Sequence, residues 1–252
     1  MRALVTGGTR GIGLACCRLF SQMGYAVTAL YSADERAAAA ARAALPAVTF
    51  LRADVSDEEA MRKVFSDIPA LDVLVNNAGI DCFAQVQDMS YSAYRRVMDV
   101  NMGGAFLAVK FAVPKMLSRG GAIVNVSSIW GVTGGSCESV YSASKGAMIA
   151  FTKALAAELA PAIRVNCIAP GAIDTAMNAG YTASERRGIE SRIPLGRFGT
   201  PEECAEAIYF LATHRYITGQ VLGVDGGPGV SAPAPSEAAG PGVSPEAAGP
   251  AA

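Results

Sequence analysis

Seven short β-rich runs alternate with helical patterns along this chain, and the alternation constrains the fold more than any other feature. Most runs are almost continuously apolar, as expected for parallel strands covered on both faces. The predicted strands are 3–6, 26–31, 48–53, 72–77, 122–127, 163–169 and 220–225. The helical patterns cover 11–23, 34–45, 57–67, 90–118, 141–160 and 201–213. This order predicts a parallel sheet with right-handed crossovers and helices on both faces.

Residues 228–252 differ from the rest of the chain. They contain PGVS twice, EAAGP twice, six of the 13 prolines and no aromatic residue. Such a segment cannot bury enough apolar surface to offset the entropy of ordering it. We therefore predict one domain over 1–227 followed by a disordered tail over 228–252, with a docking segment as the alternative for the tail.

The composition narrows the classes of partner. Apolar residues make up 51% of the chain and charged residues 17%, and the net charge is −1. Binding of nucleic acid would need a basic face, which this balance does not suggest. The opening MRALVTGG is too short an apolar run for a secretory signal, and no uncharged apolar run is long enough to span a bilayer. We expect a cytoplasmic protein that binds neither nucleic acid nor a membrane.

The six cysteines form no CxxC pair and no zinc-type spacing, so no metal site is predicted. We expect free thiols in a reducing compartment. The six are Cys16, Cys17, Cys82, Cys137, Cys167 and Cys204.

A glycine-rich loop, TGGTRGIG over 6–13, follows the first predicted strand and opens the first helix. Gly7 allows a sharp exit from the strand, and Gly11 and Gly13 allow the start of the helix to approach a pyrophosphate. Free N–H groups and the helix dipole favour an anion there. Glycines alone would also fit a plain tight turn, but their place between strand and helix predicts a dinucleotide site.

The second strand indicates which dinucleotide is bound. NAD sites usually carry an acid at the tip of this strand, but here the strand ends at Tyr31 and Ser32. Arg10 lies in the glycine loop, where its charge suits a 2′-phosphate to which Ser32 would donate. We therefore predict NADP(H). The alternative is a solvated Arg10, with Asp34 binding the ribose of NAD.

The stretch SSIWGVTGGSCESVYSASK, over 127–145, places a tyrosine four residues before a lysine. Positions i and i+4 share a helix face, so Lys145 is expected beside Tyr141. An ammonium group there favours the phenolate, which would tune the tyrosine as an acid or base for a ketone beside a nicotinamide. A serine hydroxyl would orient the carbonyl. A surface tyrosine and lysine one turn apart are the alternative for this spacing alone.

Further motifs accompany the glycine loop and YSASK. They are DV at 54–55, NNAG at 76–79, Asn101 in VNMGG, Ser128 in VSSIWG, PG at 170–171 and VDGG at 224–227. Together the motifs resemble the short-chain dehydrogenase/reductase family over residues 1 to about 227. The resemblance implies an α/β fold with a single Rossmann-type, doubly wound domain and a seven-stranded parallel sheet.

The same resemblance implies a catalytic set of Asn101, Ser128, Tyr141 and Lys145. Asn101 would hold a water that links Lys145 to solvent as a proton relay. Ser128 is preferred over its neighbour because it lies 13 residues before Tyr141, as is usual in the family.

Cofactor contacts are also implied by the resemblance. Asp54 would meet adenine, Asn77 the cofactor backbone, and 173–175 would flank the nicotinamide. With the glycine loop and the second strand, the predicted contacts are Gly7, Thr9, Arg10, Gly11, Ile12, Gly13, Tyr31, Ser32, Asp54, Val55, Asn77, Ala78, Gly79, Tyr141, Lys145, Pro170, Gly171, Ile173 and Thr175.

Two groups within the family resemble the chain: 3-oxoacyl-[acyl-carrier-protein] reductases and reductases of the 5-aminopentanone group on elongation factor P. The second substrate carries an amine, and Asp81 and Glu138 are expected at the pocket rim, where carboxylates favour a cation. NADPH-dependent reduction of that ketone on elongation factor P is the preferred function. The alternative is a 3-oxoacyl reductase, whose acidic acyl-carrier protein would meet arginines at the mouth: Arg95, Arg96 and Arg119.

Two of the substrate assignments have alternatives. Glu138 would otherwise be a solvated loop acid. Trp130 is expected beside the active site, with core filling as the alternative. Met177 belongs to a lid expected over 176–198.

Other classes of protein fit less well. A catalytically silent nucleotide-binding scaffold would keep the fold, but the complete catalytic set argues against it. A serine hydrolase needs a histidine, and the only one, His214, ends a predicted helix far in sequence from Ser128.

The long apolar helices at 90–118 and 141–160 would suit the homotetramer that is common in the family.

Overall fold

The computed structural model describes residues 1–227, whose strands form one seven-stranded parallel sheet in the order β3-β2-β1-β4-β5-β6-β7. The strands are β1 Arg2–Thr6, β2 Ala26–Tyr31, β3 Thr49–Arg52, β4 Val73–Asn76, β5 Gly121–Val126, β6 Ile163–Pro170 and β7 Val221–Val224. All seven predicted strands are present, and the doubly wound sheet is confirmed. The predicted tail over 228–252 lies outside the described residues.

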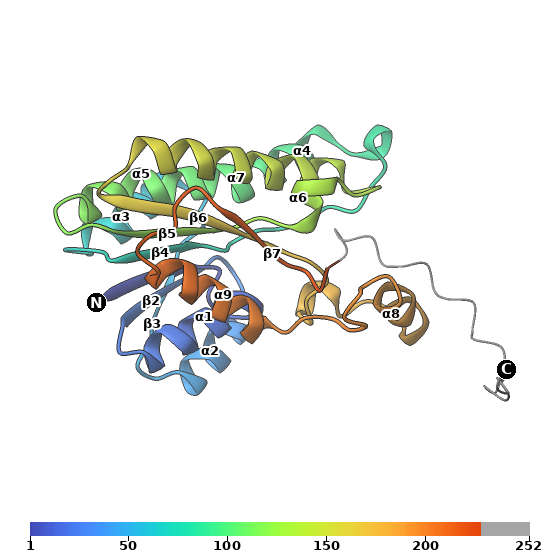
Figure 1. Cartoon of the computed structure of the whole chain (residues 1–252), viewed down its shortest axis with the longest axis horizontal. Coiled ribbons are helices and arrows are strands. Elements are labelled where there is room, and N and C mark those ends of the chain that lie inside the picture. The colour runs from blue at the N-terminus through green and yellow to red at the C-terminus, as the bar shows by residue number, and fades with distance from the viewer. Residues whose placement is uncertain (228–252) are drawn as a thin grey trace, which may run out of the picture.

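Helices cover both faces of the sheet, as Figure 1 shows. One face carries α1 (Gly11–Gln22), α2 (Glu35–Ala44) and α9 (Pro201–Thr213), and the other carries α3 (Glu58–Ser66), α5 (Gly104–Met116) and α7 (Ser139–Glu158). Each face buries its own apolar cluster, because successive strand residues point to opposite sides. Thr200 caps α9 in a capping box with Glu203, with Pro201 in the first turn.

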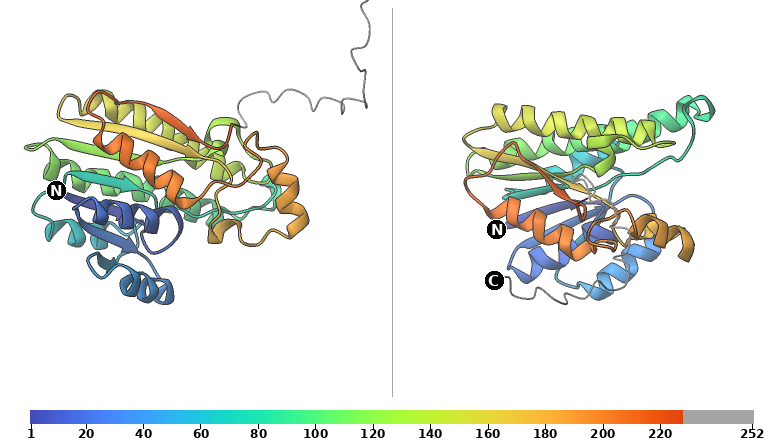
Figure 2. Two further views of the ribbon diagram at one scale, coloured as in Figure 1. Left: turned by 60° about the horizontal axis from the view of Figure 1, so that its bottom comes forward. Right: turned by 45° about the vertical axis from the view of Figure 1, so that its right-hand side comes forward.

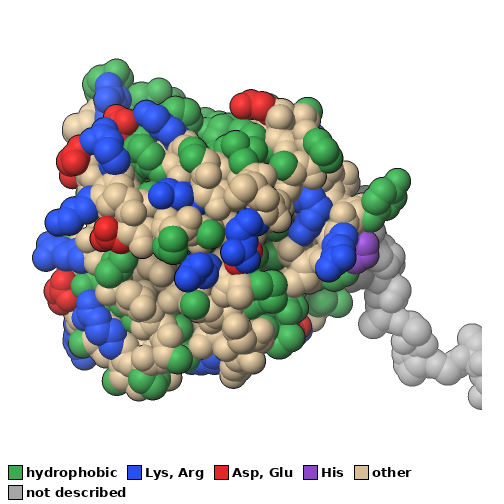
Figure 3. Space-filling view, turned by 90° about the vertical axis from the view of Figure 1, so that its left-hand side faces the viewer, with side chains coloured by type: hydrophobic (Ala, Val, Ile, Leu, Met, Phe, Trp, Pro, Cys, Tyr) green, Lys and Arg blue, Asp and Glu red, His purple; other side chains and the backbone are tan. Residues whose placement is uncertain are grey.

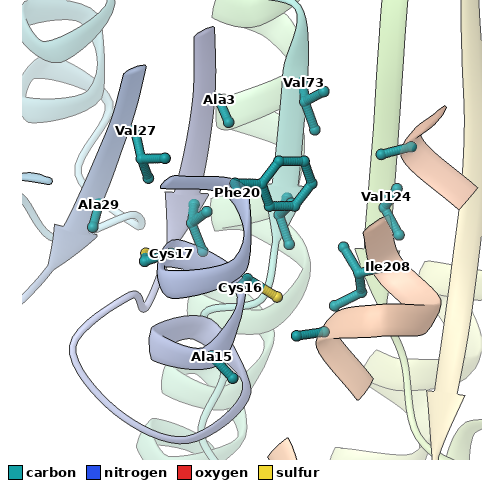
Figure 4. Packing of buried hydrophobic residues seen from close by; sticks show 14 of the residues in the cluster. Ala3, Ala15, Cys16, Cys17, Phe20, Val27, Ala29, Val73, Val124 and Ile208 are labelled. Atoms are coloured by element: carbon teal, nitrogen blue, oxygen red, sulfur yellow. The ribbon is translucent and has the colours of Figure 1, made fainter. Parts of the chain in front are cut away.

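The apolar cluster on the face of α1, α2 and α9 shows how closely α1 lies against the sheet (Figure 4). Phe20 and Cys16 are fully buried between the strands and Ile208 of α9. The pKa of the Cys16 thiol is raised, first by burial, so this thiol behaves as a small apolar side chain. All six cysteines are unpaired, as predicted.

The segment predicted as one helix over 90–118 is continuous but irregular. It consists of α4 (Tyr91–Met98), a π-helical turn (Asp99–Gly103) and α5. By length and composition alone, Tyr91–Met116 is apolar enough to cross a membrane. Its inner residues pack against the sheet in the same cluster as α3, which is the place of a core helix. The π-helical turn contains Asn101, and such turns are frequent at functional sites.

Two short helices were not predicted from the sequence. They are α6 (Ile129–Thr133), which follows β5, and α8 (Ala183–Glu190), within the segment expected as a lid. Figure 2 shows α8 standing beyond the end of the sheet. Thr182 and Glu185 form a capping box that starts α8.

The strand order reverses between β1 and β4, which lie side by side in the sheet although β2 and β3 come between them in sequence. At such a reversal the connections leave in opposite directions and open a crevice at the carboxyl ends of the strands. The glycine loop after β1 and the NNAG segment after β4 both lie at this crevice.

Candidate active site

The glycine loop joins β1 to α1 and has the backbone that its glycines permit. Gly7 and Gly11 have positive φ of 67° and 52°, a region that disfavours a Cβ atom. Gly13 has a different role from the predicted one, because a Cβ atom there would lie 2.2 Å from Gly7 O. It therefore allows α1 to pack against the loop, and only the other two shape the face toward the crevice.

A cavity at this crevice collects most of the predicted cofactor contacts. Its lining includes Gly7, Thr9, Arg10, Gly11, Ile12, Tyr31, Ser32, Asp54, Val55, Asn77, Ala78, Gly79, Tyr141, Lys145, Pro170, Gly171, Ile173 and Thr175, together with Ser128 and Met177. Five predicted residues lie outside the lining: Gly13, Asn101, Asp81, Trp130 and Glu138.

Several lining residues were missed from the sequence. They include Leu30, Asn178, Ile80 and Val100. Leu30 stands beside a predicted contact at a strand end, so the strand pattern carried a signal for it. Arg96, which was considered from the sequence only for a carrier protein, lies on α4 and also lines the cavity, as does Ser127, the serine of the pair that was not preferred.

At the end of the cavity near β2, Arg10 forms an ion pair with Asp34 at 3.1 Å. Asp34 also caps α2, because its side chain accepts a hydrogen bond from Ala37 N at 2.9 Å. Both ends of this pair are largely exposed, so its free energy is small. Arg10 is therefore held only weakly at Asp34, which is fixed by its cap and itself lines the cavity.

Asp54 lies at the end of β3, where it bonds to Arg96 at 2.9 Å and to Ser56 Oγ at 2.7 Å. Although burial acts to raise its pKa, the bonds from Ser56 and Arg96 outweigh burial and lower the pKa of this carboxyl. Asp54 therefore presents a fixed anion to the cavity, as a residue facing an adenine amine would need.

Tyr141 and Lys145 lie on the sheet-facing side of α7 and are both buried. Lys145 Nζ lies 5.7 Å from the centre of the Tyr141 ring and donates to Val126 O at 2.9 Å. The i, i+4 spacing thus brings the two together, as predicted. Ser128, just after β5, accepts from Trp130 N at 3.1 Å, which leaves its own proton free to be donated.

The expected effect of Lys145 on the tyrosine is not found. Burial raises the pKa of Tyr141 to about 12, a hydrogen bond with Ser128 lowers it, and the charges of Glu138 and Asp81 raise it further. Burial lowers the pKa of Lys145 to about 8, so that its positive charge is weakened from near that pH upward. Burial is the largest of these effects, and the phenol keeps its proton at neutral pH.

Asn101 is fully buried in the π-helical turn. Its Oδ1 accepts from Ile80 N at 2.8 Å, and its Nδ2 donates to Ile80 O at 2.9 Å and to Ser144 Oγ at 3.0 Å. Both amide hydrogens are therefore used within the protein. The side chain joins the segment after β4 to α7. A relay water would therefore have to bind a group of Asn101 other than its amide hydrogens.

The two acids predicted at the rim lie close to the tyrosine. Glu138 is the residue before α7, and its carboxylate makes no cap bond. Burial and the charge of Asp81 raise the pKa of Glu138, and both acids act on Tyr141. Glu138 is half-buried and lies outside the cavity lining, so its assignment to the substrate stays a prediction beside the solvated-acid alternative.

Trp130 and Met177 are placed differently from each other. Trp130 is 40% exposed on α6 and packs near Gly135, so core filling is wrong. Met177 is 52% exposed and lines the cavity, in the segment expected as a lid.

The three arginines considered for a carrier protein are all paired. Arg95 bonds Asp99, Arg96 bonds Asp54, and Arg119 bonds Asp72. Asp72 directly precedes β4, so Arg119 lies at the amino ends of the strands, opposite the cavity. Figure 3 shows the face at those ends, where cationic side chains are spread out rather than gathered in a patch.

Comparisons with known proteins agree with this geometry. Residues 7–228 match the family model described as enoyl-(acyl carrier protein) reductase. The chain belongs to the short-chain dehydrogenase/reductase family. It is an oxidoreductase of this family, whose members act on CH–OH and C=O groups with a nicotinamide cofactor.

Among its short-chain dehydrogenase/reductase relatives is carbonyl reductase family member 4 of Danio rerio, 44% identical over 232 residues that make up 89% of this chain and 96% of the relative. The 3-oxoacyl-[acyl-carrier-protein] reductase FabG of Chlamydia muridarum is 41% identical over 238 residues, with coverage of 89% and 96%. The structure of ligand-free aldohexose dehydrogenase from Thermoplasma acidophilum superposes with a TM-score of 0.82 at 32% identity, covering 92% of this chain and 95% of that one.

The residues around the cavity fit a nicotinamide dinucleotide. The close approach of Gly13 to Gly7 and the positive φ of Gly7 and Gly11 leave the start of α1 open for a pyrophosphate. The lining runs without a break from Arg10 and Asp54 at one end to Tyr141 and Lys145 at the other. A dinucleotide of this family would therefore span from the adenine end to the catalytic tyrosine.

Proposed function

We propose that this protein is an NADPH-dependent reductase that converts the 5-aminopentanone group on elongation factor P into a secondary alcohol. The observation that carries the substrate assignment is the pair of carboxylates, Asp81 and Glu138, whose charges reach Tyr141. A ketone that also bears an ammonium group would place its positive charge near this pair while its oxygen meets the phenol.

The preference for NADPH over NADH is supported by Arg10 and Ser32 in the cavity lining. The Arg10 guanidinium would exchange Asp34 for a 2′-phosphate at little cost, because their ion pair is exposed. Arg52 donates to Ser32 O at 3.0 Å and places a second cation beside Ser32. The Asp34 carboxylate is the feature that would favour the ribose of NAD.

In the proposed reaction, bound NADPH supplies the hydride that reduces the carbonyl carbon. Tyr141 donates its phenolic proton to the carbonyl oxygen, and its high pKa keeps that proton available at neutral pH. Ser128 donates a hydrogen bond that orients the oxygen. Lys145 Nζ is held at Val126 O, 5.7 Å from the centre of the Tyr141 ring, and is charged below its pKa of about 8, so it would balance the phenolate that forms in the reaction.

The second candidate is reduction of a 3-oxoacyl group on an acyl-carrier protein. The FabG relatives support it, and Arg96 lines the cavity. Arg119, however, pairs with Asp72 at the opposite end of the sheet, so the three arginines considered do not gather at the cavity mouth. A silent scaffold is the least supported candidate, since the tyrosine, lysine and serine meet in one cavity.

Exchange of Glu138 for glutamine tests the substrate assignment. We expect kcat/KM for a 5-amino-2-ketone model substrate to fall about fivefold, because a partly exposed ion pair contributes up to about 1 kcal/mol. The value for an acetoacetyl thioester should not change. Both are measured as NADPH oxidation.

The matched control is Glu206→Gln, at an exposed position on α9, which should affect neither substrate. Equal losses on the amino ketone and the thioester in Glu138→Gln would mean that the acid does not select for an amine. The 3-oxoacyl reductase would then be the better assignment.

The cytoplasmic location and the homotetramer stay predictions. Exposed apolar side chains such as Phe106 on α5 and Phe210 on α9 are consistent with contacts between subunits.

A further inference from the structure

Both the side chain and the main chain of Lys145 are hydrogen-bonded to residues at the carboxyl end of β5. Its Nζ donates to Val126 O at 2.9 Å, and its main-chain oxygen accepts a hydrogen bond from Ser127 Oγ at 2.7 Å. Ser127 is only 2% exposed. Its hydroxyl therefore has one fixed partner, although the residue lines the cavity beside Ser128.

The two serines of the pair thus differ in what their hydroxyls do. Ser128 accepts from Trp130 N and lines the cavity, so its own proton is available to a substrate oxygen. Ser127 donates its only proton to the backbone of Lys145. A helix carbonyl already accepts from the N–H four residues on, so this second bond fixes where the helix lies rather than completing it.

Gly131 of α6 shows how tightly this contact is packed. A Cβ atom at Gly131 would lie 2.6 Å from Ser127 Oγ and 2.7 Å from the carbonyl carbon of Lys145. A side chain there would have to push α6 away from α7 at the point where Ser127 meets the lysine. Gly131 is thus required for the same contact.

A second buried bond joins β5 to α7 farther along the helix. Asn125 Nδ2 donates to Thr152 Oγ1 at 2.8 Å. It resembles the Ser127 bond in burial and in the elements it joins, but it lies two turns from Lys145. It therefore provides a comparison that separates general stability from placement of the lysine.

We propose that Ser127 is a positioning residue, whose hydroxyl fixes the main chain of Lys145 and thereby the placement of Lys145 and Tyr141 for proton transfer to the ketone. The proposal builds on the roles given to Lys145 and Tyr141 in the proposed function. Ser127 itself does not contact the substrate in this account.

Ser127→Ala tests the proposal in the full-length protein. We expect kcat for NADPH-dependent reduction of an acetoacetyl thioester to fall about tenfold, since a small misplacement of catalytic groups has effects of this size or larger. KM for the thioester and Kd for NADPH, from a fluorescence titration, should stay within about twofold. Gly131→Ala should likewise lower kcat while leaving KM within about twofold. The variant that combines Ser127→Ala with Gly131→Ala should have a kcat no lower than that of either single variant.

Thr152→Val is the matched control. It removes the buried bond from Asn125 and the bond from Thr152 Oγ1 to Met148 O. It should therefore lower Tm at least as much as Ser127→Ala while leaving kcat within about twofold of the original. Equal kcat in Ser127→Ala and Thr152→Val would overturn the proposal. If Ser127→Ala does not fold, the comparison of Gly131→Ala with Thr152→Val decides in the same way. A wild-type protein that reduces no ketone would instead refute the proposed function.

Discussion

Tyr141→Phe lowers kcat for ketone reduction by about a thousandfold, the middle of the range for loss of a general acid, and leaves NADPH binding within about twofold. The expected loss comes only from the missing phenolic proton, because phenylalanine keeps the buried aromatic ring at this position of α7. Burial holds the pKa of Tyr141 near 12, so the phenol is protonated across the neutral range. NADPH oxidation in the presence of an acetoacetyl thioester measures kcat.

The control for this exchange is Tyr216→Phe, since Tyr216 is 98% exposed and should tolerate loss of its hydroxyl. A Tyr141→Phe protein that retains more than about a tenth of the wild-type kcat would show that another group donates the proton. Among nearby residues Ser128 would be the first candidate.

Gly13→Ala weakens NADPH binding more than tenfold and lowers Tm. The new Cβ atom would lie 2.2 Å from Gly7 O and 2.6 Å from Asn77 Nδ2. That amide donates to Thr6 O at 3.0 Å and to Gly7 O at 3.1 Å, so the added methyl separates the loop from the segment after β4. Overpacking of this kind costs about 1–3 kcal/mol, and the displaced loop is the part that faces the pyrophosphate.

Gly188→Ala provides the comparison, because nothing lies within 4 Å of a Cβ atom at that position on α8. It should bind NADPH as the unaltered protein does. Unchanged NADPH affinity in Gly13→Ala, measured by calorimetry, would mean that the glycine loop does not hold the cofactor in the way described.

The sheet could be predicted from the sequence because buried parallel strands leave almost continuous apolar runs, and each run here became a strand. The meeting of Tyr141 and Lys145 was equally accessible, because a fixed helix spacing determines it. Neither inference needed knowledge of distant contacts.

The features missed depend on burial or on partners far apart in sequence. The spacing placed Lys145 beside Tyr141, and its ammonium group was expected to lower the pKa of the tyrosine. The spacing did not show that burial would raise this pKa. The sequence did not show where the three arginines considered for a carrier protein would lie. Arg96 lines the cavity, whereas Arg119 pairs with Asp72 at the opposite end of the sheet. The packing role of Gly13 depends on the path of the loop around it, which a glycine motif alone does not give.

The most direct test of the central claim is the rate of NADPH and NADH oxidation by the purified full-length protein, with an acetoacetyl thioester and with a 5-amino-2-ketone, followed at the absorbance of the reduced nicotinamide. We predict turnover with both ketones, faster with NADPH than with NADH, with loss of turnover in Tyr141→Phe. A protein that binds NADPH but oxidises it with neither ketone would contradict the account.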